Sequence, residues 1–167
     1  LGDVYKRQYQ GRGMTVYASK AFNCKAICRM IEEEGLGLDV ASGGELYTAI
    51  QAGFPAERIH FHGNNKTEQE IRLALEYEIG HFIADNLTEL QTIDRLAKEA
   101  GKVAHVSLRV KPGIDAHTHS FIQTGQIDSK FGFALETGEA MEAVEAALKY
   151  QNLSLIHISE PTRPERI

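Results

Sequence analysis

Short β-like runs alternate with longer amphipathic runs along most of the chain. The short runs end in polar or glycine-containing turns and predict five strands, at residues 14–19, 37–42, 59–63, 81–85 and 105–112. After each strand the apolar positions take up helical spacing. This spacing predicts helices over residues 23–35, 45–53, 65–80, 88–100 and 138–150, the last of them preceded by a long polar loop, residues 113–132.

Specific residues mark the ends of these predicted helices. Gly35, Gly53 and Gly101 follow three of the helical runs, where glycine is the usual residue just beyond a helix C-terminus. Thr67 precedes Glu70 by three residues, which is the spacing of a capping box at a helix start. The alternation of strands and helices therefore rests on end signals as well as on periodicity.

Strands that alternate with helices are typical of an α/β fold with a parallel sheet. The pattern suits either a doubly wound sheet or a (β/α)8 TIM barrel. No G-x-G-x-x-G sequence follows the first strand, so a dinucleotide-binding Rossmann domain is disfavoured. In the barrel interpretation the chain is a partial (β/α)8 TIM barrel, with about five of the eight βα units.

The two ends of the chain have related coding sequences. One permitted set of codons for residues 1–8, LGDVYKRQ, has a reverse complement that translates as LSLIHISE, the sequence of residues 153–160. Coincidence is the alternative, but the shared element resembles a transposase sequencing adapter read in both orientations. We therefore expect residues 1–8 and 153–167 to be adapter-derived and non-native, and leave them out of the element prediction. Residues 9–152 are then expected to be the N-terminal part of the barrel.

Charge and composition narrow the class of partner. The chain has 18 Lys+Arg and 23 Asp+Glu, and residues 9–152 alone have 14 and 20, a net charge of −6. An acidic chain without a basic cluster disfavours nucleic acid as a partner. No apolar run reaches the ~18 residues that suggest a membrane span. Cys24 and Cys28 suit neither a disulfide nor a complete metal site, which favours free thiols in a reducing cytoplasm.

Polar side chains gather at the carboxyl ends of all five predicted strands, where barrel enzymes carry their sites. They are Lys20, Asp39, Ser42, His62, Asn64, Asp85 and Arg109. One such residue alone is often only a solvated loop residue, but five strand ends on one rim indicate a site. A lysine there can form a Schiff base with a carbonyl compound, and pyridoxal phosphate is the commonest cofactor held in this way.

Five separated blocks carry a resemblance to a known family. They are YASKAFN, GLDVASGGEL, HGNNKT, VSLRVKPGIDAHTH and SKFGF, in this order along residues 14–150. These blocks resemble the fold-type III pyridoxal-phosphate-dependent decarboxylases of ornithine, lysine, arginine and diaminopimelate. The resemblance implies an alanine-racemase-like barrel, pyridoxal 5'-phosphate as cofactor, and a cytoplasmic homodimer.

The resemblance also implies a role for each matched residue. Lys20 would be the catalytic lysine that binds the cofactor, with Asp39 beside it. Arg109 would lie near the phenolic side of the cofactor. His62 and Asn64 would line the same pocket.

The blocks favour one substrate within the family. HGNNK and AHTHSFIQTG favour meso-2,6-diaminopimelate, whose decarboxylation gives L-lysine and CO2 in the last step of lysine biosynthesis. Ornithine, arginine and carboxynorspermidine are alternative substrates. A non-catalytic relative that binds pyridoxal phosphate or a partner protein is a further alternative, although retention of Lys20 argues against it.

Two features limit what the chain is expected to do alone. His117 and His119 form a His-x-His arrangement, but a tetrahedral site lacks its other ligands, so we interpret them as part of a polar loop and expect no metal. The family's phosphate-binding loop has no counterpart among the matched blocks. We therefore expect this chain by itself to be inactive.

Overall fold

The computed structural model describes residues 13–113 and 131–159. Five parallel strands lie side by side in the order in which they occur along the chain. They are β1 (Val16–Ala18), β2 (Gly37–Val40), β3 (Ile59–Phe61), β4 (His81–Ala84) and β5 (Ala104–Lys111). Each lies within a predicted strand or within one residue of its bounds, because strand residues next to a turn often leave the ladder.

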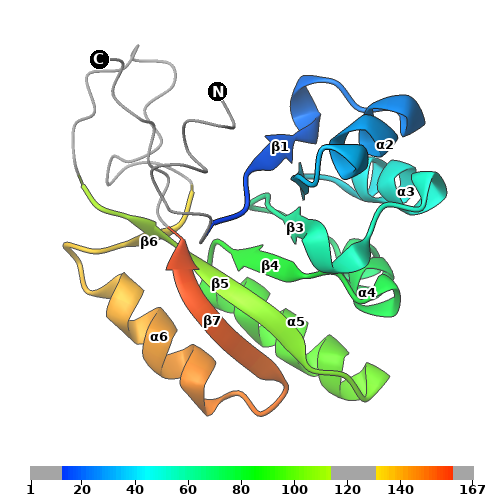
Figure 1. Ribbon diagram of the computed structural model, residues 1–167. Helices are drawn as coiled ribbons and strands as arrows, with labels where there is room; N and C mark the ends of the chain where they lie inside the picture. Colours follow the sequence, from blue (N-terminus) through cyan, green and yellow to red (C-terminus); the bar gives the residue numbers. More distant parts are fainter. Residues whose placement is uncertain (1–12, 114–130, 160–167) are drawn as a thin grey trace.

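The strand order decides between the two folds that the sequence allows. A doubly wound sheet reverses its order at a switch point, so its first strand lies inside the sheet. Here β1 lies at the edge and each later strand is added on the same side, which is the winding of a barrel (Figure 1). The partial barrel is therefore confirmed, and the doubly wound alternative is wrong.

Helices connect the strands at the places that the sequence predicts. They are α2 (Lys25–Glu33), α3 (Gly43–Ala52), α4 (Glu68–Tyr77), α5 (Leu87–Ala100) and α6 (Glu139–Lys149), with short 3-10 turns η1 (Ser19–Ala21) and η2 (Ala56–Arg58). Gly53 and Gly101 take left-handed conformations just after α3 and α5. Among the described residues, none of these helices has the length and apolar character needed to cross a bilayer.

Two strands lie outside the sequence prediction. β6 (Phe133–Ala134) pairs with the end of β5, and two residues are too few to show a periodic pattern. β7 (Leu153–Ser159) pairs with the rest of β5, within the segment that the element prediction leaves out. Its sequence, LSLIHIS, is rich in leucine and isoleucine, which suits a strand that follows a crossover helix.

The strands divide their side chains between two faces. Leu38, Val40, Ile59 and Phe61 are fully buried and join the core with the helices. The alternate positions point to the other face, which is the inside of a barrel. Polar residues such as His60, His81 and Ser107 lie on that face together with the apolar Ile83. The stacked rings of His60 and His81 lie across β3 and β4 with centroids 4.8 Å apart.

Glu70 links two helix starts near the site. Its Oε2 accepts a hydrogen bond from the backbone N–H of Thr67 at 2.8 Å, and Thr67 caps α4 in return, so the predicted capping box is confirmed. Its Oε1 accepts a hydrogen bond from Gly43 N at 2.6 Å, at the first residue of α3. One carboxylate therefore holds the starts of two consecutive helices together.

Replacing Glu70 should weaken both helix starts. Glu70→Ala is expected to lower the free energy of unfolding by about 1–3 kcal/mol, because it removes one cap and leaves the Gly43 N–H without its acceptor. Urea unfolding measures this change. Glu68→Ala is the matched control, since Glu68 lies exposed in the same helical turn and forms a surface ion pair with Arg95, worth at most about 1 kcal/mol. Equal losses in the two variants would contradict the double role of Glu70.

Candidate active site at the carboxyl ends of the strands

Lys20 lies in η1, directly after β1, and is exposed. The turn that carries it is fixed by its neighbours. The buried Ser19 donates a hydrogen bond from Oγ to Oε2 of Glu45 at 2.9 Å, and the same carboxylate oxygen accepts from Ala41 N at 2.7 Å. Asn23 donates from Nδ2 to the backbone oxygen of Glu45 at 3.3 Å. The lysine therefore stands on a backbone tied to the start of α3, with its amine accessible.

Asp39 and His62 lie beside each other at the ends of β2 and β3. His62 Nε2 is 3.7 Å from Asp39 Oδ1, and both side chains are less than a third exposed. Burial raises the pKa of Asp39 to about 6, against which the charge of Lys20 acts. Burial and then the charge of Arg109 lower the pKa of His62 to about 3. An ion pair would shift both pKa values the other way, so at neutral pH the carboxylate is charged and the imidazole is neutral.

These two pKa shifts predict opposite effects of acid on stability. Folded His62 has a pKa of about 3 against an ordinary 6.5, so between these values only the unfolded chain binds the proton, and acidification destabilises the fold. Folded Asp39 has a pKa of about 6 against 3.8, so acidification across that window stabilises the fold.

Between about pH 6.5 and pH 4, His62→Asn should therefore lose less stability than the unsubstituted protein, by up to about 3 kcal/mol. Asp39→Asn should lose more stability than the unsubstituted protein as the pH falls over the same range. Urea unfolding at a series of pH values measures both. If the two variants changed the pH dependence in the same direction, the assigned protonation states would be wrong.

Arg109 is oriented from two sides. Its Nη1 lies 3.6 Å from Oδ2 of Asp85, whose side chain is 1% exposed at the end of β4. Burial raises the pKa of Asp85, and the charge of Arg109 opposes this. The guanidinium carbon lies 4.6 Å from the centre of the Phe131 ring. Gly132, at φ +74°, lets the chain pass the backbone of Arg109, where a Cβ would lie 2.5 Å from its carbonyl oxygen.

The remaining predicted residues contribute less. Asn64 is half-buried in the loop after β3, and within the described ranges no hydrogen bond or ion pair joins it to the other candidates. Ser42 accepts a hydrogen bond from Glu45 N at 3.3 Å and acts as the cap of α3. His117 and His119 lie outside the described residues. In residues 13–113 and 131–159, no group of three or more His, Cys, Asp or Glu side chains is arranged to hold a metal ion.

Sequence reasoning missed the charged residues directly below the rim. Lys66 and Glu89 form a buried ion pair, 2.6 Å from Nζ to Oε1. Lys66 belongs to the HGNNKT block. Because lysine is rarely buried without a partner, this lysine was the feature of the sequence that could have indicated a buried ion pair. Its partner Glu89 lies on α5, 23 residues further along the chain, and no local pattern specifies this pairing.

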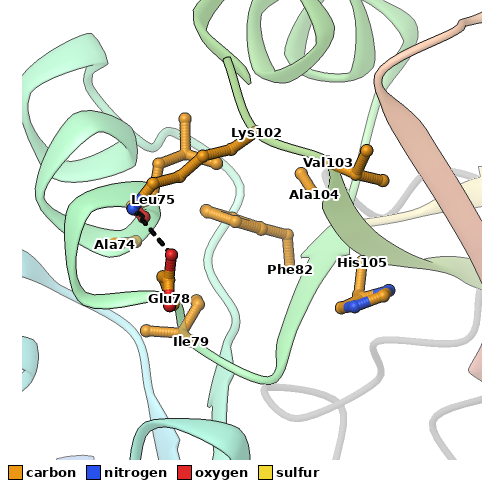
Figure 2. A pocket seen from close by; sticks show the side chains of 9 residues that line it. All are labelled: Ala74, Leu75, Glu78, Ile79, Phe82, Lys102, Val103, Ala104 and His105. Carbon is orange, nitrogen blue, oxygen red and sulfur yellow. Dashed lines mark hydrogen bonds and ion pairs between the residues drawn. The ribbon is translucent and has the colours of Figure 1, made fainter. Parts of the chain in front are cut away.

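An open pocket lies away from this rim. It has a volume of about 330 Å³ and opens between α4 and the amino ends of β4 and β5 (Figure 2). Lys102 lies along its wall, donates to Leu75 O at 2.8 Å and pairs with Glu78 at 3.1 Å. None of the residues that line this cavity belongs to the candidate site.

Comparisons with known proteins identify the family of this chain and agree with the fold. Residues 3–160 match the family described as pyridoxal-dependent decarboxylase, pyridoxal binding domain. The chain is 52% identical over 147 residues to diaminopimelate decarboxylase of Bacillus subtilis, covering 88% of this chain and 34% of the relative. It is 51% identical over 154 residues to the Staphylococcus aureus enzyme, covering 90% and 36%.

Solved structures give the same picture. The structure of diaminopimelate decarboxylase from M. jannaschii in complex with L-lysine superposes with a TM-score of 0.85 at 38% identity, covering 95% of this chain and 37% of that chain. The chain thus spans about a third of the length of the curated relatives that it matches. By its fold, its rim of polar residues and the extent of the match, the chain belongs to the pyridoxal-dependent decarboxylases, through their pyridoxal-binding domain.

Proposed function

We propose that the full-length protein containing this chain decarboxylates meso-2,6-diaminopimelate to L-lysine and CO2, with pyridoxal 5'-phosphate as its cofactor. The main support is the placement of Lys20 on the polar rim, within a stretch about half identical to diaminopimelate decarboxylases. In this proposal Lys20 is the catalytic residue, and Asp39, His62, Asn64 and Arg109 contact the cofactor.

The described residues fit the aldehyde side of this cofactor. Lys20 offers an accessible amine to a carbonyl group. Asp39 stays charged at neutral pH beside it, and His62 stays neutral and can accept a hydrogen bond. Arg109 can donate hydrogen bonds to an anionic oxygen. The bound cofactor supplies an electron sink for the charge left on the α-carbon when CO2 departs.

The phosphate group needs donors from elsewhere in the full-length protein. Helix N-termini often bind phosphate through their free N–H groups. The described starts of α3, α4 and α5 carry side-chain caps, from Ser42, Thr67 and Asn86, and those of α2 and α6 carry none. No phosphate-binding loop is among the matched sequence blocks, so we propose that the 167-residue chain alone releases no lysine from diaminopimelate.

A substrate comparison tests the proposed activity. The full-length protein, loaded with pyridoxal phosphate, is incubated separately with meso-diaminopimelate, ornithine, arginine and carboxynorspermidine, and CO2 release is measured. We expect release from meso-diaminopimelate, with lysine as the amine product. Faster release from another of the four would replace the substrate assignment, and no release from any would favour a non-catalytic relative.

An ornithine-type substrate has weaker support. A lysine/ornithine decarboxylase from Vibrio vulnificus, solved in complex with putrescine, is 26% identical with a TM-score of 0.67 and covers 95% of this chain and 39% of that chain. Both values are lower than those of the diaminopimelate decarboxylase from M. jannaschii. The higher identity and TM-score of the diaminopimelate decarboxylase favour diaminopimelate over ornithine as the substrate.

We further propose that the full-length protein is a cytoplasmic homodimer. The thiols of Cys24 and Cys28 are both free, which suits a reducing compartment.

We also propose that residues 9–152 are native and that residues 1–8 and 153–167 derive from an adapter. The uninterrupted gene should diverge from this sequence before Tyr9 and after Asn152, and a gene that encodes both flanking segments would refute the adapter origin.

A further inference from the structure

Lys66 is held in one position below the rim. Its side chain is 1% exposed, in the loop between β3 and α4. Nζ donates to Gly63 O at 2.8 Å, to Ile83 O at 2.8 Å and to Glu89 Oε1 at 2.6 Å. A lysine ammonium has three N–H donors, so each has an acceptor. Lys66 therefore ties its own loop to β4 and to α5.

Glu89 carries this link to Asp85. It lies in the first turn of α5, with its side chain 5% exposed and its backbone N–H bonded to Asn86 Oδ1 at 2.8 Å. Its second oxygen, Oε2, lies 3.5 Å from the backbone nitrogen of Asp85. Lys66 also holds the carbonyl of Ile83, two residues before Asp85. The ion pair thus fixes the chain at Ile83 and at Asp85 itself.

A buried ion pair needs a reason beyond stability. Desolvation of two charges commonly offsets their attraction, and an apolar pair of similar volume often gives an equally stable protein. Here Glu89 approaches the backbone of Asp85 and the charge of Lys66 acts on its carboxylate, whose two oxygens are buried and accept no hydrogen bond from the described residues. The charged groups that face this carboxylate are Arg109 from β5, Lys66 from the β3–α4 loop and Glu89 from α5.

We infer that Lys66 and Glu89 are positioning residues of the candidate site, which fix the backbone of Asp85 and set the electrostatic potential that its carboxylate experiences opposite Arg109. The inference depends on the proposed function only in taking this rim as the cofactor site. The two charges act on Asp85 in opposite directions. Lys66 favours the ionised carboxylate that pairs with Arg109, and Glu89 disfavours it.

This opposition gives a direct test in the full-length, cofactor-free protein. Aspartate is labelled with 13C at its side-chain carboxyl group, and the Asp85 resonance is identified by its loss in Asp85→Asn. Its pKa is then measured by NMR titration. Lys66→Met should raise the pKa of Asp85 and Glu89→Gln should lower it, each by about one unit or more, the size expected for loss of a neighbouring charge.

Lys102→Met is the matched control. Lys102 also donates to two backbone carbonyls, of Leu75 and Glu76, and pairs with Glu78, but it lies by the cavity away from the rim (Figure 2). Lys102→Met should lower the free energy of unfolding without changing the pKa of Asp85.

A purely structural role for the pair predicts that the pKa of Asp85 stays unchanged, or that it shifts in the same direction in both variants. Either result would overturn the inference. If Lys66→Met does not fold, Glu89→Gln decides alone, because its amide oxygen can still accept from Lys66 and an unchanged or raised pKa of Asp85 contradicts the inference. Failure of the proposed function has a separate sign: the parent protein would show no visible absorbance band on addition of pyridoxal phosphate.

Discussion

Lys20→Ala in the full-length protein is expected to abolish the visible absorbance band of bound pyridoxal phosphate and to lower kcat/KM for meso-diaminopimelate by roughly 10⁴-fold or more. Losses of this size follow removal of a group that makes a covalent bond in the reaction. Lys20 is the accessible lysine of the rim, on a turn held by Ser19 and Glu45. The folded state should be preserved, since the exposed side chain contributes little packing.

Lys25→Ala is the control for this substitution. Lys25 is exposed at the start of α2, five residues further along, and the substitution removes the same charge without changing any residue of the candidate site. Absorbance and kinetics should match those of the parent protein. A Lys20→Ala variant that kept both the absorbance band and its turnover would remove Lys20 from the proposed site and leave another amine to be found.

Lys66→Met is expected to cause the largest loss of stability, about 3–5 kcal/mol, because it leaves the Glu89 carboxylate buried without its cation. The double variant Lys66→Met/Glu89→Leu removes both charges and keeps apolar volume in their place. It should recover to within about 1–2 kcal/mol of the parent protein. Urea unfolding of the parent, the two single variants and the double variant gives the coupling free energy between the two positions.

The surface pair Arg72–Glu99 is the comparison for this cycle. Its side chains are 50% and 43% exposed, so the same cycle there should give at most about 1 kcal/mol of coupling. Coupling at Lys66 and Glu89 no larger than this would mean that water reaches the pair and screens its charges.

Most of the fold could be predicted because its signals are local. The period of apolar residues, the glycines after α3 and α5 and the Thr67–Glu70 capping box each lie within one element. Several strand ends differ from the predicted ends by one or two residues, and β6 was missed because two residues carry no period. Whether the sheet is doubly wound or a barrel depends on which strands pair, and no single element specifies this.

The sequence by itself determined that the chain alternates strands and helices, that polar residues follow the strands, and that Lys20 belongs to a block resembling a pyridoxal-phosphate family. Tertiary structure alone decided which of these residues meet. Asp85 faces Arg109 only because β4 and β5 are neighbours, and Lys66 reaches Glu89 across 23 residues of sequence. The protonation states of Asp39 and His62 were also decided there, because desolvation depends on what the rest of the chain places around a group.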